Sequence, residues 1–372
     1  MAGTKIIGVS LTNILITLCF LYLINISLGF NNQALVEHLD AFFQQQQNDP
    51  TGLAVGVFRS GKIIYERYRG YSDKSDNRFV NEETVFEWGS ITKVLTWVSV
   101  MQLKEEGKLD LEQDIRELLP EDFFKKLTYD QRITLIHLMN HTGGWKDENM
   151  GLINSQQFNG LKNALQQTEP EQIMPPGRQS VYCNWSTALA GYIVEQISGM
   201  SFAEYVHQKI FNPLQIKQSA LLPDLSDNPW VQNQRKKIKT YDFQGDALEG
   251  PQFSTSLYPA GMTTGTLKDL LTFAVALNDL EDSPLFKDSE TLQEFFSPTL
   301  ADKESGFPRI CHGLWCFLYN LPAMGHMGST KGFTSLLLFD PYQAYGTVIL
   351  TNKQWENTFI EGIAQIVFGE NE

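Results

Sequence analysis

The stretch Phe86-Glu87-Trp88-Gly89-Ser90-Ile91-Thr92-Lys93 decides how the rest of this chain is interpreted. It predicts a turn followed by a helix that carries a serine and, one turn later, a lysine. Residues three apart on a helix share a face, so Ser90 and Lys93 can meet in one pocket. A serine beside a neutral amine is an activated nucleophile. Roughly one S-x-x-K is expected by chance in a chain of this length, so the motif needs support from elsewhere.

Composition excludes some classes of function. The 372 residues are 42% hydrophobic and 19% charged, which allows a large core in one domain or in two closely packed ones. The formal net charge is −14, and the longest basic run is Arg235-Lys236-Lys237. A chain this acidic is not expected to bind nucleic acid.

The N-terminal segment differs from everything after it, because residues 6–28 contain no charged side chain. A run of about 20 apolar residues is long enough to cross a membrane. Residues 1–29 therefore predict either a signal peptide that is cleaved after Gly29 or a membrane anchor that is retained. A buried core helix is the remaining alternative. Both leading interpretations predict export to the periplasm or the cell exterior, with residues 6–28 as the possible membrane attachment.

Periodicity after this segment predicts an α+β fold. Strands are expected near both chain ends, at 53–58, 62–68, 313–319, 324–328, 333–339 and 345–351. Helices are expected at 32–46, 90–106, 133–141, 158–167, 185–198, 202–210, 267–277, 291–296 and 359–368. The polar stretch 222–257 predicts a long irregular excursion.

The simplest packing of these elements is an antiparallel sheet built from both chain ends and flanked by helices, with a helical insertion. The predicted hydrolase domain covers residues 30–372. Its sheet part covers about 30–90 and 300–372, and its helical part about 91–299.

Two more motifs follow Ser90-x-x-Lys93 in a fixed order. Tyr182-x-Asn184 begins 92 residues after Ser90, and His326-x-Gly328 begins another 144 residues later. Only the folding of the chain could bring motifs so far apart in the sequence into one site.

With these three motifs the chain resembles the penicillin-recognising serine hydrolases, which include class C β-lactamases, D-alanyl-D-alanine carboxypeptidases, D-aminopeptidases and related esterases. The resemblance covers about residues 51–368. Supporting stretches lie at 133–144, 176–177, 190–195 and 259–262. It implies a β-lactamase-like or penicillin-binding-protein-like fold. The third motif carries His326 at a position where many relatives have lysine. Among the relatives, histidine at this position is commoner in peptidases and esterases than in β-lactamases.

The resemblance also implies roles for single residues. Ser90 would attack the substrate carbonyl and form an acyl-enzyme, with Lys93 or Tyr182 as the base. Desolvation of the buried Lys93 amine should disfavour its charged form. Asn184 would orient Lys93 and the substrate amide. The site is expected to bind substrate also through His326, Gly328 and Ser329, with the backbone N–H groups of Ser90 and Ser329 binding the oxyanion.

Each residue also has a simpler interpretation. Tyr182 could be a packed aromatic residue, Asn184 a helix N-cap and His326 a structural histidine with satisfied hydrogen bonds. Lys331 could bind a substrate carboxylate or lie solvated on the surface.

Other residues suggest structural roles. His137 and His141 could in principle hold zinc, but without H-E-x-x-H they are interpreted as structural. Three cysteines follow the export segment, so a complete disulfide framework is not expected. Cys311 and Cys316 are expected to face opposite sides of one strand as free thiols.

The sequence thus predicts an exported serine hydrolase of the β-lactamase and D-peptidase type, acting on a small peptide-like amide or ester. It needs no cofactor and no metal. A true β-lactamase or an esterase is the alternative within the same chemistry. From another class, the alternative is an inactive relative that binds cell-wall peptide.

Overall fold

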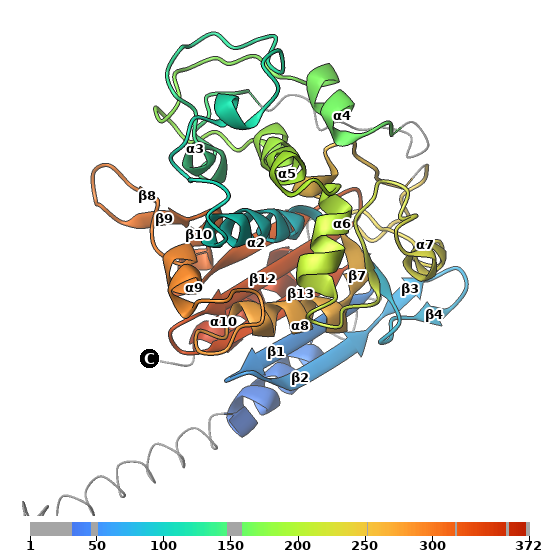
Figure 1. Cartoon of the computed structure of the whole chain (residues 1–372). Coiled ribbons are helices and arrows are strands. Elements are labelled where there is room, and N and C mark those ends of the chain that lie inside the picture. The colour runs from blue at the N-terminus through green and yellow to red at the C-terminus, as the bar shows by residue number, and fades with distance from the viewer. Residues whose placement is uncertain are drawn as a thin grey trace, which may run out of the picture.

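The computed structural model of the protein describes residues 32–45, 51–146, 158–250, 252–316, 318–354 and 357–369 (Figure 1). Residues 32–45 form a helix, as predicted. The strands are β1 (Leu53–Arg59), β2 (Lys62–Arg69), β3 (Tyr71–Asp73), β4 (Arg78–Phe79), β5 (Val85–Glu87), β6 (Ser219–Ala220), β7 (Thr264–Thr266), β8 (Leu300–Ala301), β9 (Pro308–Cys311), β10 (Leu314–Cys316), β11 (Met324–Ser329), β12 (Thr334–Asp340) and β13 (Tyr345–Thr351). The helices are α2 (Thr92–Glu105), α3 (Leu135–Met139), α4 (Leu161–Gln167), α5 (Asn184–Ser198), α6 (Phe202–Val206), α7 (Pro229–Arg235), α8 (Leu267–Leu277), α9 (Ser289–Phe295) and α10 (Asn357–Gly369).

An antiparallel sheet forms the centre of the molecule. Within the described residues it has eight strands in the order β2-β1-β13-β12-β11-β10-β9-β8. β1 pairs with β13 along its whole length, from Leu53 opposite Thr351 to Arg59 opposite Tyr345. The two ends of the chain therefore lie side by side in one sheet, which confirms the predicted α+β fold.

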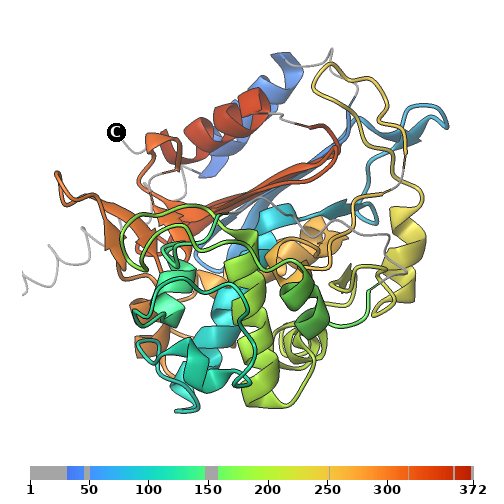
Figure 2. The same cartoon turned by 90° about the horizontal axis from the view of Figure 1, so that it is seen from above.

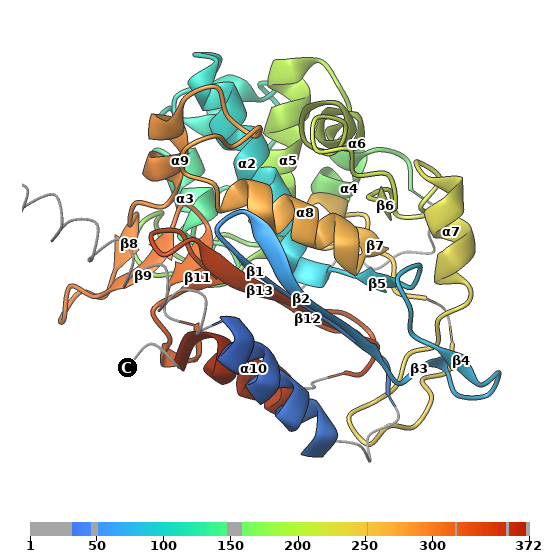
Figure 3. The same cartoon turned by 90° about the horizontal axis from the view of Figure 1, so that it is seen from below.

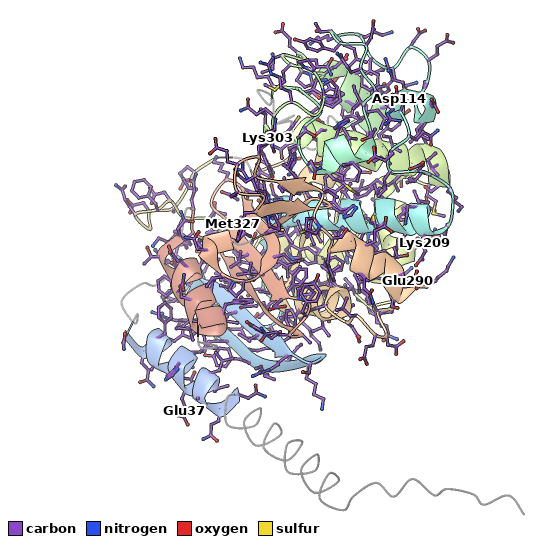
Figure 4. The ribbon with its side chains drawn as sticks, turned by 90° about the vertical axis from the view of Figure 1, so that its left-hand side faces the viewer. Glu37, Asp114, Lys209, Glu290, Lys303 and Met327 are labelled. Carbon is purple, nitrogen blue, oxygen red and sulfur yellow. The ribbon has the colours of Figure 1, made fainter. Side chains whose placement is uncertain are left out.

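Helices cover both faces of this sheet. The helix at 32–45 and α10 lie side by side on one face (Figures 2 and 3), where the rings of Phe42 and Phe359 are 5.8 Å apart. On the other face α8 packs directly on the strands, and a Cβ added to Gly56 would lie 2.3 Å from Leu271. In Figure 4 Glu37 and Asp114 lie at opposite ends of the molecule, with Met327 of the sheet between them.

Besides the two-stranded sheet of β3 and β4, the described residues form a three-stranded sheet in the order β5-β7-β6. β5 pairs with β7, with Phe86 opposite Gly265. This small sheet carries the segment that leads directly into the Ser90 turn.

α2 is the central helix of the helical region, and hydrophobic residues bury it on every side. Val94, Trp97, Val98 and Met101 have no exposed surface. The helix ends where predicted, because Gly107 adopts a left-handed φ of 67° directly after it.

The polar segment 222–257 is less irregular than predicted, since it contains α7. Asn228 caps this helix by accepting the backbone N–H of Val231, and Pro229 occupies its first turn. The prediction missed the helix because seven residues are too few to show a helical period among polar neighbours.

The prediction that Cys311 and Cys316 face opposite sides of one strand is wrong. They lie on β9 and β10, which form a hairpin around His312 and Gly313, with Cys311 opposite Leu314. In this arrangement their sulfurs are 2.7 Å apart. The cysteines of the described residues are free thiols. The alternation rule failed because it holds within a strand and not across a turn.

The predicted export segment at 6–28 lies outside the described residues. Among the helices that the structure does describe, none has both the length and the apolar character needed to cross a membrane.

Candidate active site

The turn that carries Ser90 requires glycine before it. β5 ends at Glu87, and Gly89–Ile91 form a short 3-10 turn that leads into α2. Gly89 has a φ of 51°, which glycine adopts readily. A Cβ added to it would lie 2.8 Å from the backbone nitrogen of Ser329. The turn therefore packs closely against β11 and leaves Ser90 partly exposed.

Ser90 lies between an amine and a phenol. Lys93 Nζ is 3.0 Å from Ser90 Oγ, and the Tyr182 hydroxyl donates to the same oxygen at 2.8 Å. Lys93 is fully buried, and its Nζ lies 4.9 Å from the centre of the Tyr182 ring. The structure thus brings together the three residues that the sequence predicted as catalytic.

Two further oxygens fix the Lys93 amine. Nζ donates to Asn184 Oδ1 at 2.7 Å and to the Ala260 carbonyl at 2.6 Å. A neutral amine has two N–H groups for these acceptors and one lone pair for the hydroxyl hydrogen of Ser90. A charged amine would instead donate three hydrogen bonds. The geometry suits both protonation states of the amine.

Asn184 is the first residue of α5, and the alternative that it is the N-cap is wrong. Cys183 holds that position, with its sulfur accepting the backbone N–H of Ser186 at 3.4 Å. Cys183 is buried, as expected for a residue facing the core. The amide oxygen of Asn184 is therefore available to Lys93 rather than being needed for the cap.

His141 supports the segment around Tyr182. Its carbonyl accepts the N–H of Val181 at 2.8 Å, and its Nδ1 accepts the N–H of Cys183 at 3.2 Å. Its ring centre lies 4.5 Å from that of Tyr182. Burial, the charge of Lys93 and the nearby His326 hold the pKa of His141 well below its usual value. A neutral His141 can therefore pack beneath the Tyr182 ring.

His137 and His141 have separate partners. His137 belongs to the capping box of α3, where its Nδ1 accepts the N–H of Thr134 at 3.1 Å. Within the described ranges no group of three or more His, Cys, Asp or Glu side chains is arranged to hold a metal. The zinc alternative therefore finds no third ligand there.

His326 lies on β11 and is 2% exposed. Its Nδ1 is 2.6 Å from the Met327 carbonyl, so this nitrogen carries the hydrogen. Its Nε2 is buried and has no hydrogen-bond partner among the described residues. Burial and the charge of Lys93 lower the pKa of His326 to about 3. His326 is thus a neutral residue with a free acceptor atom, and the alternative of a satisfied structural histidine does not describe it.

We expect His326 to make the protein less stable in acid. An unfolded histidine binds a proton below about pH 6.5, whereas folded His326 stays neutral down to about pH 3. The free energy of unfolding should therefore fall between pH 6.5 and 3, with a contribution of about 2 kcal/mol from His326 between pH 7 and 5. Urea unfolding at both pH values should show a smaller loss for His326→Gln than for wild type. His38 lies on the exposed side of the helix at 32–45, so His38→Gln is the control and should lose as much stability as wild type. Equal losses for all three proteins would contradict the assignment.

The other residues of the third motif, Gly328 and Ser329, also lie at the site and line the same pocket as Ser90. A Cβ on Gly328 would lie 2.2 Å from both the Ser335 hydroxyl oxygen and the Trp88 carbonyl oxygen, so contacts within the protein require glycine here. Lys331 also lines the pocket and donates to the Glu249 carbonyl at 2.9 Å. Its binding of a substrate carboxylate stays a prediction.

These residues open onto one pocket of about 900 Å³. Ser90, Tyr182 and His326 line it, and hydrophobic side chains form much of its wall. Its hydrophobic lining residues include Phe253, Trp315, Leu318 and Met327. A pocket of this size and lining is typical of sites for small organic molecules.

The sequence did not assign roles to two parts of this site. The Ala260 carbonyl holds Lys93, but a backbone acceptor leaves no residue-type signal beyond the Pro259-Ala260-Gly261-Met262 stretch already noted. Trp315 stacks with His141 and Tyr182 at ring distances of 6.2 and 6.5 Å. Its position depends on the unpredicted β9–β10 hairpin.

Comparison with known proteins identifies relatives over most of the chain. Penicillin-binding protein 4* of Bacillus subtilis is 24% identical over 362 residues, which cover 90% of this chain and 76% of that protein. Protein flp of Staphylococcus aureus is 22% identical over 320 residues, covering 82% of this chain and 60% of flp. The crystal structure of FmtA from Staphylococcus aureus has the same fold, with a TM-score of 0.72 and 20% identity over 91% of this chain and 90% of FmtA.

The family described as Beta-lactamase matches residues 33–366, which include every part of the site around Ser90. The match spans nearly the whole described structure and agrees with the penicillin-binding-protein-like fold. This chain belongs to the β-lactamase family.

Proposed function

We propose that the protein is an exported serine hydrolase that cleaves a peptide-like amide or ester through an acyl-enzyme on Ser90. The observation that carries this proposal is the position of Ser90 Oγ, 3.0 Å from Lys93 Nζ and 2.8 Å from Tyr182 Oη, in the lining of a pocket. A hydroxyl placed between two groups that can exchange protons is the arrangement that nucleophilic catalysis needs.

In the proposed acylation, Ser90 Oγ attacks the substrate carbonyl while its proton passes to Lys93. Burial of Lys93 favours the neutral amine that can accept this proton. The bond from the carbonyl carbon to the leaving nitrogen or oxygen then breaks, and the leaving atom takes a proton from Tyr182. The proton on Lys93 replaces the one that Tyr182 has lost. Water later cleaves the acyl-serine bond and restores Ser90.

The proposed oxyanion site consists of the backbone N–H groups of Ser90 and Ser329. The close packing of Gly89 against Ser329 places these two segments side by side. A single donor of this type typically contributes about 3–4 kcal/mol to transition-state stabilisation. Ser90 and Ser329 would thus supply a large part of the rate enhancement without using any side chain.

The pocket wall favours substrates with an apolar side chain. Phe253, Trp315, Leu318 and Met327 line the space beside Ser90. A polar or charged substituent would lose its hydration against these side chains without gaining a partner. We therefore expect peptide-like amides or esters with apolar groups to react faster than polar analogues of the same length.

The proposal also includes export directed by residues 1–29, with residues 6–28 as a possible anchor. Its support is the uncharged run from Ile6 to Leu28. Determining the N-terminus of the mature protein, and its distribution between membrane and soluble fractions, would separate a cleaved signal from an anchor.

The test of the hydrolase proposal is the mass of the intact protein after exposure to a fluorescent penicillin or a fluorophosphonate. We expect one covalent adduct, located on Ser90 by peptide mapping. Turnover of nitrocefin, a p-nitrophenyl ester and a D-amino-acid amide by the same preparation would then distinguish β-lactamase, esterase and D-peptidase activity. A folded protein that forms no adduct and turns over no substrate would be an inactive relative, and the hydrolase proposal would fail.

A further inference from the structure

A buried ion pair lies directly behind the proposed oxyanion site. Glu87 and Arg235 are 2% and 3% exposed. Arg235 donates through Nη2 and Nε to Glu87 Oε1, at 2.7 and 3.0 Å. The second carboxylate oxygen, Oε2, accepts the hydroxyl of Thr330 at 2.6 Å. Each carboxylate oxygen of Glu87 therefore has a defined partner.

Arg235 is itself held firmly in place. Its Nη1 donates to the Ile238 carbonyl at 3.3 Å, and its guanidinium lies 4.8 Å from the centre of the Phe333 ring. A planar guanidinium combines these contacts in a way that an ammonium cannot. Because Arg235 is fixed, the orientation of the Glu87 carboxylate is fixed as well.

The location of this ion pair tells more about its role than its contribution to stability does. Burying two charges costs about as much solvation as their attraction returns, so a buried ion pair is weak evidence for stability. Glu87 lies three residues before Ser90, however, and Thr330 directly follows Ser329. The hydrogen bond from Thr330 to Glu87 therefore joins the two segments that supply the oxyanion donors.

No backbone ladder joins these two segments. β5, which carries Glu87, belongs to the small sheet with β7 and β6, whereas β11, which carries Ser329, belongs to the main sheet. Side-chain bonds span the gap instead. Thr330 binds the carboxylate of Glu87, and the hydroxyl of Ser335 donates to the Trp88 carbonyl at 2.8 Å. The spacing of the two N–H donors thus depends on these side chains.

We propose that Glu87 is a positioning residue for catalysis, which acts through Thr330 to fix the distance between the N–H groups of Ser90 and Ser329. This inference rests on the proposed function above. Donors that must be aligned with a developing negative charge tolerate little displacement. Loosening this contact should lower the rate of the chemical step more than it weakens substrate binding.

Thr330→Val is the most direct test, because valine has the shape of threonine but cannot donate to Glu87. We expect kcat per active site to fall about tenfold, the loss that follows from partial misplacement of one oxyanion donor, with KM changed less than about twofold. Thr330→Ser keeps the hydroxyl and should restore most of the wild-type kcat. Active sites are counted by titration with the fluorophosphonate, so unfolded protein does not enter the rate.

Glu87→Gln tests the same contact from its other side, at a residue that does not line the pocket. It should lower kcat in the same direction as Thr330→Val. If both substitutions act through one contact, the double variant should be no slower than the slower single variant. Should Glu87→Gln fail to fold, the comparison of Thr330→Val with Thr330→Ser still decides the question.

Several results would overturn the inference while leaving the hydrolase proposal intact. They are an unchanged kcat per active site in Thr330→Val, a change confined to KM, and independent losses that multiply in the double variant. A wild-type protein without adduct or turnover would instead overturn the proposed function, and the inference with it. The two failures are therefore distinguishable from the wild-type measurement alone.

Discussion

Ser90→Ala is expected to abolish the covalent adduct and to reduce turnover of the best substrate by roughly 10⁴-fold or more. The substitution removes the oxygen that forms the acyl bond. Lys93 and Tyr182 remain in this variant, but their proposed role is to transfer protons and not to attack the substrate carbonyl. Intact-protein mass after labelling and steady-state rates measure the two effects.

The fold of this variant should survive. Ser90 is partly exposed, and removing its hydrogen bonds with Lys93 and Tyr182 costs only about 1–2 kcal/mol. Ser99→Ala is a matched control on the same helix, since the Ser99 hydroxyl donates only within the helix, to the Leu95 carbonyl at 2.8 Å. It should label like wild type. Turnover by Ser90→Ala at a near-normal rate would show that Ser90 is not the nucleophile.

Lys93→Arg should reduce turnover by about 10³-fold, within the range that a general base contributes. A guanidinium stays protonated, so it cannot take the proton of Ser90. It is also larger than the amine that fits between Asn184 Oδ1 and the Ala260 carbonyl. The rate of acylation, followed by adduct formation over time, measures the loss.

This variant also distinguishes the two candidate bases. If Tyr182 is the base, Lys93 serves mainly as a positive charge near its ring, at 4.9 Å from the centre, and arginine would preserve that charge. Activity within about tenfold of wild type would then favour Tyr182 and contradict the role proposed for Lys93. Lys104→Arg is the matched control on α2, because Lys104 forms a surface ion pair with Glu294 away from the pocket. Its activity should be unchanged.

Local sequence predicted much of the fold. The apolar run of β1, the β-rich run of β2 and the glycine after α2 identified those elements close to their observed ends. Short elements were harder to predict. The helix α7 is an example, because two helical turns in a polar segment show little periodicity. The error at Cys311 and Cys316 has a related cause. A two-residue turn reverses the strand direction and places on the same face residues that alternation within one strand would separate.

The sequence predicted those site residues that belong to recognisable motifs. It did not predict contacts made by backbone atoms or by a charged residue far away in the sequence. The motif sequences named Ser90, Lys93 and Tyr182 without any structure. The Ala260 carbonyl has no side-chain signature. Arg235 lies in the segment predicted as irregular, 148 residues from the glutamate that it pairs with.

The sequence by itself determined which groups are available for chemistry and in what order they follow one another. Only the tertiary structure decided where each group lies and what it contacts. It set the distances of 3.0 and 2.8 Å around Ser90 Oγ, it left His326 neutral with a free acceptor atom, and it placed Glu87 behind Thr330. The physical reason is that hydrogen bonds and desolvation depend on distances of a few ångströms between residues that lie far apart in the sequence, such as Thr330 and Glu87 at 243 positions. Those distances are fixed when the two sheets and the central helix pack together.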